Sequence, residues 1–317
     1  MPRQKRVEYA GAIYHVMSRG DRRENIVRDD ADREMWVTTL GQACAKCDWE
    51  VHAYNLMSNH FHLVVETPLG NLVSGMKWFL GTYTIRFNTW HHLSGHLFAG
   101  RYKSLIVDET EGEYLRVDCD YVHLNPSRAK LLSPEQPLSD YRWSSYLDYL
   151  RPKSRRPKWL RTDRLLGEHG LLRDDRRSRL EFSRRMELER SDRNQPSISN
   201  AAIRKSWWLG GEEFMARLLD RLEGTFTESH LAKERLDTAE MKAERIIQAR
   251  LNQLGWTEAD LRERGKGAPE KVDIAEQLRA EATLSLKRVA ARLSMGSWNN
   301  VSTLLHKRNK KTSRKLR

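Results

Sequence analysis

The most constraining feature of the sequence is a pair of alternating segments that lie two residues apart. Residues 50–57 read EVHAYNLM and residues 60–66 read HFHLVVE, with Ser58 and Asn59 between them. Alternation of this kind favours strands, and so short a connection favours an antiparallel hairpin. We expect this hairpin to be central to a sheet, because an isolated hairpin is only marginally stable.

The segments around the hairpin supply the other elements of the sheet. Strands are predicted over residues 12–17 and 102–107, and helices over residues 31–47 and over about twenty residues after Gly70. The succession is β-α-β-β-α-β, a ferredoxin-like topology of the α+β class, which alone says little about function. A further helix over residues 111–124 is expected to end at Asn125-Pro126, because proline cannot continue the hydrogen-bond ladder.

Charge divides the chain into unequal parts. Residues 1–150 contain 17 Lys and Arg against 19 Asp and Glu, whereas residues 151–317 contain 39 against 24. We expect a first, ferredoxin-like domain over residues 1–150, a basic linker over residues 151–197 and an all-α domain over residues 198–317. A basic surplus of this size favours attraction to nucleic-acid phosphates.

The end of the all-α domain has the outline of a helix-turn-helix. Leu286 to Leu305 read as a helix, a break at Met295-Gly296-Ser297 and a second helix that begins near Trp298-Asn299. An apolar helix pair is often mere packing, but the basic run that starts at Lys307 favours a DNA-binding role.

Composition and cysteine usage exclude several classes of protein. No apolar run approaches the roughly 18 residues of a membrane span, and the N-terminus lacks the apolar stretch of a secretory signal. We therefore expect a cytoplasmic, nucleoid-associated protein with no membrane partner. Three cysteines cannot build a disulfide framework, and Cys44-Ala-Lys-Cys47 lacks the second pair of a zinc site, so packed thiols are predicted.

Two short motifs carry the chemistry. His60 and His62 alternate on a predicted strand, so both imidazoles face one side and can bind one cation, while Phe61 faces the core. Tyr121 and Asn125 stand four residues apart on a predicted helix, hence on one face. A cation held by His60, His62 and Asn125 would activate a phosphodiester toward attack by Tyr121.

Several separated motifs resemble the REP-associated tyrosine transposases, which belong to the HUH endonuclease superfamily. They are Tyr14-His15-Val16-Met17-Ser18-Arg19-Gly20, Met57-Ser58-Asn59-His60-Phe61-His62, Gly100-Arg101-Tyr102-Lys103-Ser104 and Tyr121-Val122-His123-Leu124-Asn125-Pro126. The likeness covers about residues 5–150, and the motifs occur in the family's order. A looser likeness to the helical extension of longer members covers residues 287–298.

The resemblance implies a single-strand DNA strand transferase with Tyr121 as nucleophile, a 5′-phosphotyrosine intermediate and a free 3′-hydroxyl. It also implies Mg²⁺ or Mn²⁺ as cofactor and single-stranded, hairpin-forming DNA as partner. Related insertion-sequence enzymes have glutamine where this chain has the shorter Asn125, so the third metal ligand is less secure than His60 and His62. A homodimer, and attack by the tyrosine of a partner subunit, stay open.

Three nearby residues could compete for roles in this site. Tyr114 lies on nearly the same helical face as Tyr121, but Asp118 stands where a partner such as Asn125 would be. His123 is rotated about 200° from Tyr121 along the helix, which favours a structural or DNA-contacting role. Glu66 shares the strand face of the histidines, but its place at the strand end favours solvent exposure.

DNA contacts are predicted in both halves of the chain. They are Arg19, Arg22, Arg23, Arg101 and Lys103 in the first half, and Trp298, Asn299 and Lys307 in the second. Alternative functions are a DNA-binding regulator that has lost catalysis, a replication initiator or relaxase-type nickase, and a zinc-stabilised RNA-binding module of the same fold. Intact His60, His62 and Tyr121 count against the regulator.

Overall fold

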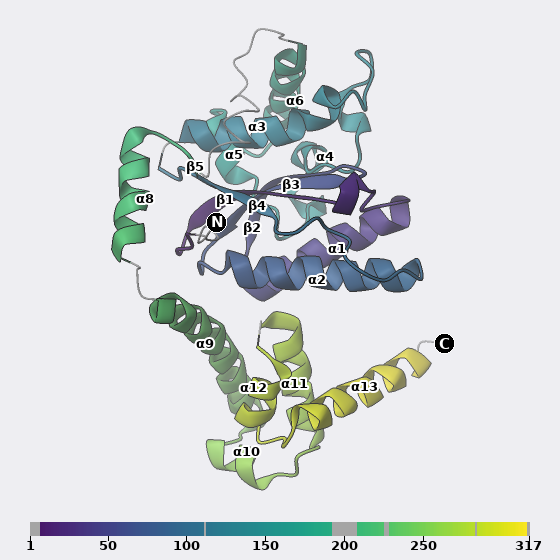
Figure 1. Cartoon of the computed structure of the whole chain (residues 1–317), viewed down its shortest axis with the longest axis vertical. Coiled ribbons are helices and arrows are strands. Elements are labelled where there is room, and N and C mark those ends of the chain that lie inside the picture. The colour runs from purple at the N-terminus through teal and green to yellow at the C-terminus, as the bar shows by residue number, and fades with distance from the viewer. Residues whose placement is uncertain (1–6, 111, 192–207, 225–227, 283, 316–317) are drawn as a thin grey trace. The chain divides into compact units, whose positions relative to one another are not determined.

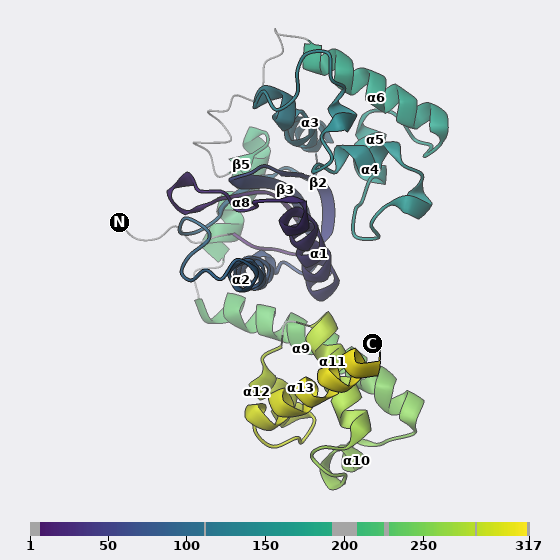
Figure 2. The same ribbon diagram turned by 90° about the vertical axis from the view of Figure 1, so that its right-hand side faces the viewer.

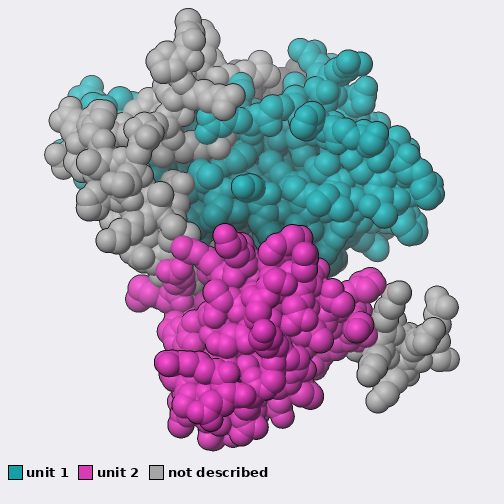
Figure 3. All heavy atoms as spheres, turned by 60° about the horizontal axis from the view of Figure 1, so that its bottom comes forward, with its two compact units in different colours: residues 1–44, 48–226 teal, residues 45–47, 227–317 magenta. Residues whose placement is uncertain are grey.

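The chain forms two compact units in this computed structural model (Figure 3). Unit 1 comprises residues 1–44 and 48–226, and unit 2 comprises residues 45–47 and 227–317. The structure describes residues 7–110, 112–191, 208–224, 228–282 and 284–315. Each unit is treated by itself.

Unit 1 is built on a five-stranded sheet with the strand order β2-β3-β1-β4-β5. The strands are β1 (Ala12–Arg19), β2 (Glu50–Leu56), β3 (His60–Thr67), β4 (Lys103–Val107) and β5 (Trp208–Leu209). Neighbours among the first four are antiparallel, whereas β5 runs parallel to β4. The predicted ferredoxin-like arrangement of the α+β class is confirmed, with β5 as an additional edge strand.

Two helices cover one face of the sheet, α1 (Asp30–Cys47) and α2 (Leu72–Trp90) (Figure 1). The side chain of Asp29 accepts a hydrogen bond from the backbone N–H of Asp32 and so caps α1. Phe61 of β3 packs against Trp36 of α1 and Phe79 of α2, with ring centroids 5.1 and 6.0 Å away. Because side chains alternate along a strand, this packing turns His60 and His62 to the opposite face.

Helix α3 (Gly112–Arg128) lies on that opposite face (Figure 1). The prediction that it ends at Asn125-Pro126 is wrong, because the helix continues through Pro126 to Arg128. Proline in the last turn removes a single backbone donor, and the carbonyl of Asn125 still accepts from the N–H of Ala129.

The predicted linker is, in its described part, a folded layer of unit 1. Short helix α4 (Tyr146–Leu150), α5 (Asp163–Glu168) and α6 (Arg176–Ser191) lie on the same side of the sheet as α3 (Figure 2). Helix α6 is highly charged, but its Phe182 is fully buried and stacks on Tyr149 at 5.3 Å between ring centroids. Two apolar residues one turn apart, Phe182 and Met186, are enough to dock this helix. Residues 192–197 lie outside the described residues.

The boundary between the units also differs from the predicted residue 198 and falls between residues 226 and 227. β5 joins the sheet of unit 1, and helix α8 (Glu212–Gly224) follows it. Arg217 of α8 pairs with the buried carboxylate of Asp108 at 3.2 Å. A two-residue strand has no periodicity that a sequence could reveal, so only the tertiary structure assigns this segment.

Unit 2 is helical, as predicted. It contains α9 (Glu228–Leu254), α10 (Glu258–Glu263), α11 (Pro269–Glu281), α12 (Leu286–Arg292) and α13 (Trp298–Lys315). Its core includes Ile247, Leu251, Ile274, Leu278, Val289 and Val301. The turn between α12 and α13 contains Ser294 and Gly296 with positive φ, which closes the helix pair that the sequence outlines.

The three cysteines are buried and, among the described residues, form no disulfide bond, which agrees with the prediction of packed thiols. Across the described ranges of both units, no helix is long and apolar enough to cross a membrane.

Candidate active site

The two histidines of β3 are held by their Nδ1 atoms. Nδ1 of His60 lies 2.7 Å from Oδ1 of Asn59, and Nδ1 of His62 lies 2.8 Å from Nε2 of His15. The two rings are 5.2 Å apart, measured between centroids. Because a side-chain oxygen can only accept, His60 carries its proton on Nδ1 and keeps the lone pair of Nε2 available.

His15 reaches this site from the neighbouring strand β1. Met17 is the register partner of His62, so His15 lies two residues along on the same face of the sheet. Its other ring nitrogen, Nδ1, lies 2.6 Å from Oδ1 of Asp118 on α3. The sequence prediction did not include His15 or Asp118, although both lie in or beside motifs that carry the family resemblance.

Both β3 histidines are neutral at ordinary pH. Burial, helped by the nearby positive charge of Arg19, lowers the pKa of His60 to about 4. Burial also lowers the pKa of His62 well below its ordinary value, and the neighbouring His15 and His60 add to this shift. Neutral imidazoles are lone-pair donors, so these residues suit metal ligation rather than proton donation.

Tyr121 of α3 faces the same group of rings. Its ring centroid lies 5.8 Å from that of His62 and 6.0 Å from that of His15. The guanidinium carbon of Arg128, two turns further along α3, lies 4.9 Å from the centre of the Tyr121 ring. The helix therefore presents Asp118, Tyr121 and Arg128 along one face, toward the histidines of the sheet.

Asn125 lies on this face one turn after Tyr121 and is buried. Among the described residues, no hydrogen bond joins its side chain to His60 or His62, and no group of three or more His, Cys, Asp and Glu could hold a metal ion. The imidazoles of His60 and His62 nevertheless suit a divalent cation, because their Nδ1 atoms are engaged and they are neutral. An amide oxygen such as that of Asn125, water or substrate would have to complete the coordination.

Residues 8–125 match the family model described as "Transposase IS200 like". The match covers 118 of the 317 residues, all of them in unit 1 except residues 45–47. This segment contains His15, His60, His62, Asp118, Tyr121 and Asn125, and it ends before Arg128.

A search of the curated proteins found no match. Among solved structures, the chain is similar to one described as "Structure of the REP associates tyrosine transposase bound to a REP hairpin", at 16% identity and a TM-score of 0.40. The likeness covers 49% of this chain and 87% of that one. A TM-score this low carries no argument about function.

The sheet of unit 1 places two of the predicted phosphate contacts on the same face as the histidines. Arg19 is the register partner of His60, and Lys103 is the partner of Met17, so both lie on the histidine face of the sheet and both are exposed. Arg22 and Arg23 follow β1 in an exposed 3-10 turn with positive φ values of 50° and 66°. The backbone carbonyl of Arg23 accepts a hydrogen bond from Asn59, which ties this turn to the start of β3.

The other predicted DNA contacts are not assembled at the histidines in the same way. Arg101 is exposed just before β4. Trp298, Asn299 and Lys307 are exposed on α13 and belong to unit 2.

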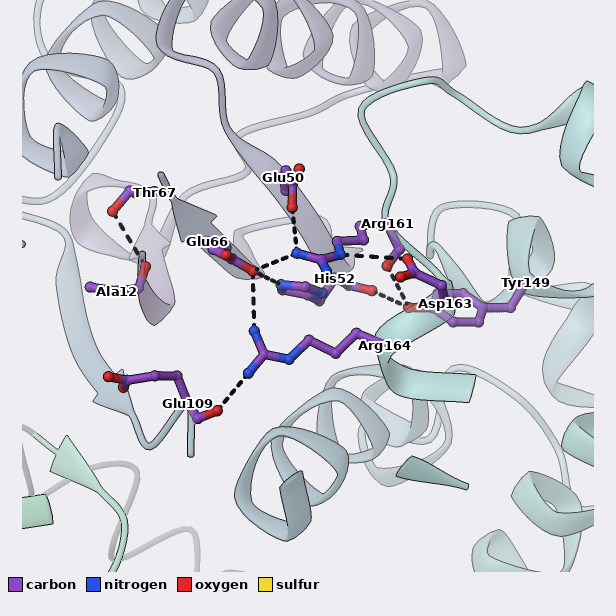
Figure 4. Close-up of polar contacts among 10 residues, drawn as sticks. All are labelled: Ala12, Glu50, His52, Glu66, Thr67, Glu109, Tyr149, Arg161, Asp163 and Arg164. Atoms are coloured by element: carbon purple, nitrogen blue, oxygen red, sulfur yellow. Dashed lines mark hydrogen bonds and ion pairs between the residues drawn. The ribbon is translucent and has the colours of Figure 1, made fainter. Parts of the chain in front are cut away.

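Glu66 at the end of β3 is not the solvent-exposed group that the sequence suggests. Its carboxylate lies 3.1 Å from Nε2 of His52, 3.2 Å from Arg161 and 3.3 Å from Arg164 (Figure 4). Burial alone would raise the pKa of Glu66, but the hydrogen bond with His52 and the two arginines outweigh it and lower that pKa. Glu66 thus connects the sheet of unit 1 to Arg161 and Arg164, which lie in the predicted linker.

His123 lies on the side of α3 away from the histidine site, as its helical phase predicts. Its Nε2 lies 2.9 Å from the hydroxyl of Ser145, and its ring packs against Tyr149 at 5.1 Å between centroids. Burial lowers its pKa to about 3. His123 therefore has a structural role in the packing of α3.

Proposed function

We propose that the protein cleaves and rejoins single-stranded DNA through a covalent bond to Tyr121, with a divalent cation held by His60 and His62. The observation that carries this proposal is the position of the Tyr121 ring, 5.8 Å from the ring of His62, inside a segment that matches the IS200-like transposases. A phenol with an ordinary pKa near 10 attacks a phosphodiester slowly, so the site has to supply electrophilic help.

The residues of the site have separate tasks in this scheme. Neutral His60 and His62 offer Nε2 lone pairs, and the amide oxygen of Asn125 is the proposed third protein donor. When bound, Mg²⁺ or Mn²⁺ would polarise a phosphate oxygen and offset the charge that develops during attack. Arg19 and Lys103, exposed on the same sheet face, would attract the DNA backbone.

The reaction needs no external energy source, because each step exchanges one phosphoester bond for another. The bond between Oη of Tyr121 and phosphorus forms while the bond between phosphorus and the 3′-oxygen of the preceding nucleotide breaks. Tyr121 loses its phenolic proton, and the leaving oxygen gains one and becomes a free 3′-hydroxyl. The resulting 5′-phosphotyrosine can be attacked by a DNA 3′-hydroxyl, which reverses the step and rejoins or transfers the strand.

The substrate is proposed to be a single strand that forms a hairpin, on the strength of the sequence motifs shared with the REP-associated tyrosine transposases. We assign the helix pair α12–α13 of unit 2 to additional DNA contact. Its support is the row of exposed side chains along α13, namely Trp298, Asn299, Ser302, Thr303, His306 and Lys307. A row that repeats every four residues forms one continuous helix face, as groove recognition requires.

The test of the chemistry is adduct formation. Purified full-length protein is incubated with end-labelled hairpin oligonucleotides and Mn²⁺, and the products are separated under denaturing conditions. We expect a protein–DNA adduct that Tyr121→Phe abolishes and that the matched variant Tyr114→Phe retains. Binding of several hairpins without any adduct would favour a non-catalytic DNA-binding protein. An adduct that survives in Tyr121→Phe would move the nucleophile elsewhere.

The role of unit 2 is tested by the salt dependence of DNA binding. Lys307→Ala should weaken binding and reduce the slope of log K against log[salt] by about 1, because one phosphate contact is lost. Arg262→Ala on α10 removes the same charge away from the α13 face and is the matched control. Equal effects of both variants would mean that only net charge matters.

A further inference from the structure

We propose that His15 and Asp118 are a positioning pair that holds His62 with the lone pair of Nε2 turned toward the metal. The inference deepens the proposed function and rests on it, since it assumes that His62 is a metal ligand. His15 and Asp118 touch no substrate in this scheme. They act through the ring of His62.

Two proton assignments satisfy these contacts, and we take the one in which His15 is neutral, because it leaves the lone pair on Nε2 of His62 available for a metal. Oδ1 of Asp118, as a carboxylate oxygen, accepts from Nδ1–H of His15 at 2.6 Å. A neutral His15 then has a lone pair on Nε2, and this atom accepts from Nδ1–H of His62 at 2.8 Å. His62 therefore carries its single proton on Nδ1 and leaves Nε2 unprotonated. The opposite assignment, in which a charged His15 donates to both neighbours, would put a proton on Nε2 of His62 and block ligation.

Burial makes this chain of contacts specific. Asp118 is fully buried, and its second oxygen, Oδ2, has no hydrogen-bond partner in the described part of the chain. His15 is therefore the one hydrogen-bond partner of the Asp118 carboxylate among the described residues. A buried charge with one unpaired oxygen is costly to retain for packing alone, which points to a role in the site.

The same contacts join the strand that carries the ligand to the helix that carries the nucleophile. Asp118 precedes Tyr121 by three residues, so both lie on one face of α3. The two hydrogen bonds that join Asp118 to His15 and His15 to His62 thus connect α3 to β1 and β1 to β3. We infer that the pair also keeps the ring of Tyr121 in register with the metal site.

His60 has a simpler version of the same device. Its Nδ1 is held by the side-chain oxygen of Asn59, which is itself anchored on the backbone of Arg23. Both candidate ligands therefore take the same tautomer, one through a neutral amide and the other through a buried carboxylate. Ligand histidines in metalloproteins are oriented by such partners, and loss of a partner typically weakens metal affinity about 10–100-fold.

The first measurement reads the tautomer without metal or substrate. Nitrogen-15 NMR of the metal-free full-length protein should show His62 protonated on Nδ1 and unprotonated on Nε2. In Asp118→Asn, where an amide can also donate to His15, we expect this assignment to be mixed or reversed. A wild-type His62 with its proton on Nε2, or a tautomer that does not respond to Asp118→Asn, would overturn the proposal.

The second measurement is the affinity for Mn²⁺, read from the free-ion signal by electron paramagnetic resonance. Asp118→Asn and His15→Phe should each weaken binding about 10–100-fold. The matched control is Asp120→Asn, two residues along α3, which removes the charge of a buried carboxylate that contacts His169 instead. Thermal unfolding of each metal-free variant separates misfolding from a local effect, and equal Mn²⁺ losses in Asp118→Asn and Asp120→Asn would refute the positioning role.

The outcomes also separate this inference from the proposed function. Mn²⁺ binding that depends on Asp118, without any DNA adduct, would support the positioning pair and contradict the strand transferase. An adduct that requires Tyr121, with Mn²⁺ affinity indifferent to His15 and Asp118, would support the strand transferase and contradict the pair.

Discussion

Helix α3 has a histidine–carboxylate pair on each of its two sides, and the two pairs differ in what the histidine touches next. On the sheet side, Asp118 contacts His15, whose other nitrogen lies 2.8 Å from His62. On the outer side, Asp120 contacts His169 at 3.1 Å, and the ring of His169 packs edge-on against Phe182 at 5.1 Å between centroids. Both carboxylates are almost completely buried.

Residue types alone therefore do not distinguish a candidate active site from a structural pair in the core. The outer pair ends in aromatic packing, so its hydrogen bond satisfies buried polar groups and does nothing further. The inner pair ends at a neutral histidine on the face that Tyr121 also lines. We therefore propose a catalytic role for the inner side of α3 and a stabilising role for the outer side.

The largest expected effect is on the inner side. His62→Ala should reduce the rate of DNA adduct formation roughly 1000-fold, because it removes a proposed metal ligand and with it several kcal/mol of transition-state stabilisation. His123→Ala on the outer side is the matched substitution and should leave the rate, measured per folded molecule, within a few fold. Comparable losses in both variants would erase the distinction between the two sides.

A large stability effect is expected on the outer side. Phe182→Ala should lower the free energy of unfolding of unit 1 by about 3–5 kcal/mol, since a fully buried aromatic ring leaves a cavity behind. Denaturant unfolding followed by near-ultraviolet circular dichroism measures this change. Mn²⁺ affinity at a temperature where the variant is folded should not change. A shift in affinity would show that α6 also supports the metal site.

His123, on the outer side of α3, should make the free energy of unfolding depend on pH. Its pKa is about 3 in the folded protein against about 6.5 when unfolded, so the unfolded chain binds the proton more readily. The stabilisation is complete above pH 6.5 and should decline by about 1.4 kcal/mol per pH unit as the pH falls toward 3. Denaturant unfolding at pH 7 and pH 5 should show this decline in the wild type and a shallower one in His123→Gln. Parallel profiles would mean that other groups dominate.

The smallest effect concerns Arg128, whose guanidinium lies over the Tyr121 ring. An exposed cation–π contact contributes about 0.5–1 kcal/mol, so Arg128→Gln should slow adduct formation about 2–5-fold. Lys130→Gln, two residues later and also exposed, is the control for loss of charge. A loss above about 100-fold would instead assign Arg128 a direct contact with the reacting phosphate.

The order of strands and helices around the hairpin of unit 1, and the common face of His60 and His62, follow from periodicity in the sequence. Alternation around Phe61 places His60 and His62 on one face, and a four-residue spacing places Asn125 one turn from Tyr121, because strand and helix periods are properties of the backbone alone. The same reasoning assigned His123 to the other side of α3. Local periodicity also outlined the helices of unit 2, since their apolar positions repeat along the chain.

Contacts between residues that are far apart in the sequence are visible in the tertiary structure but not in local sequence patterns. His15 and Asp118 are 103 residues apart, and nothing in local spacing indicates that they form a hydrogen bond. The same holds for the contacts of Glu66 with Arg161 and Arg164, and for the pairing of the two-residue strand β5. Because the sequence does not reveal these contacts, residues 151–197 and 198–226 look separate from the first domain. Such contacts depend on how sheets and helices pack. A one-dimensional pattern records the period of an element but not its neighbours.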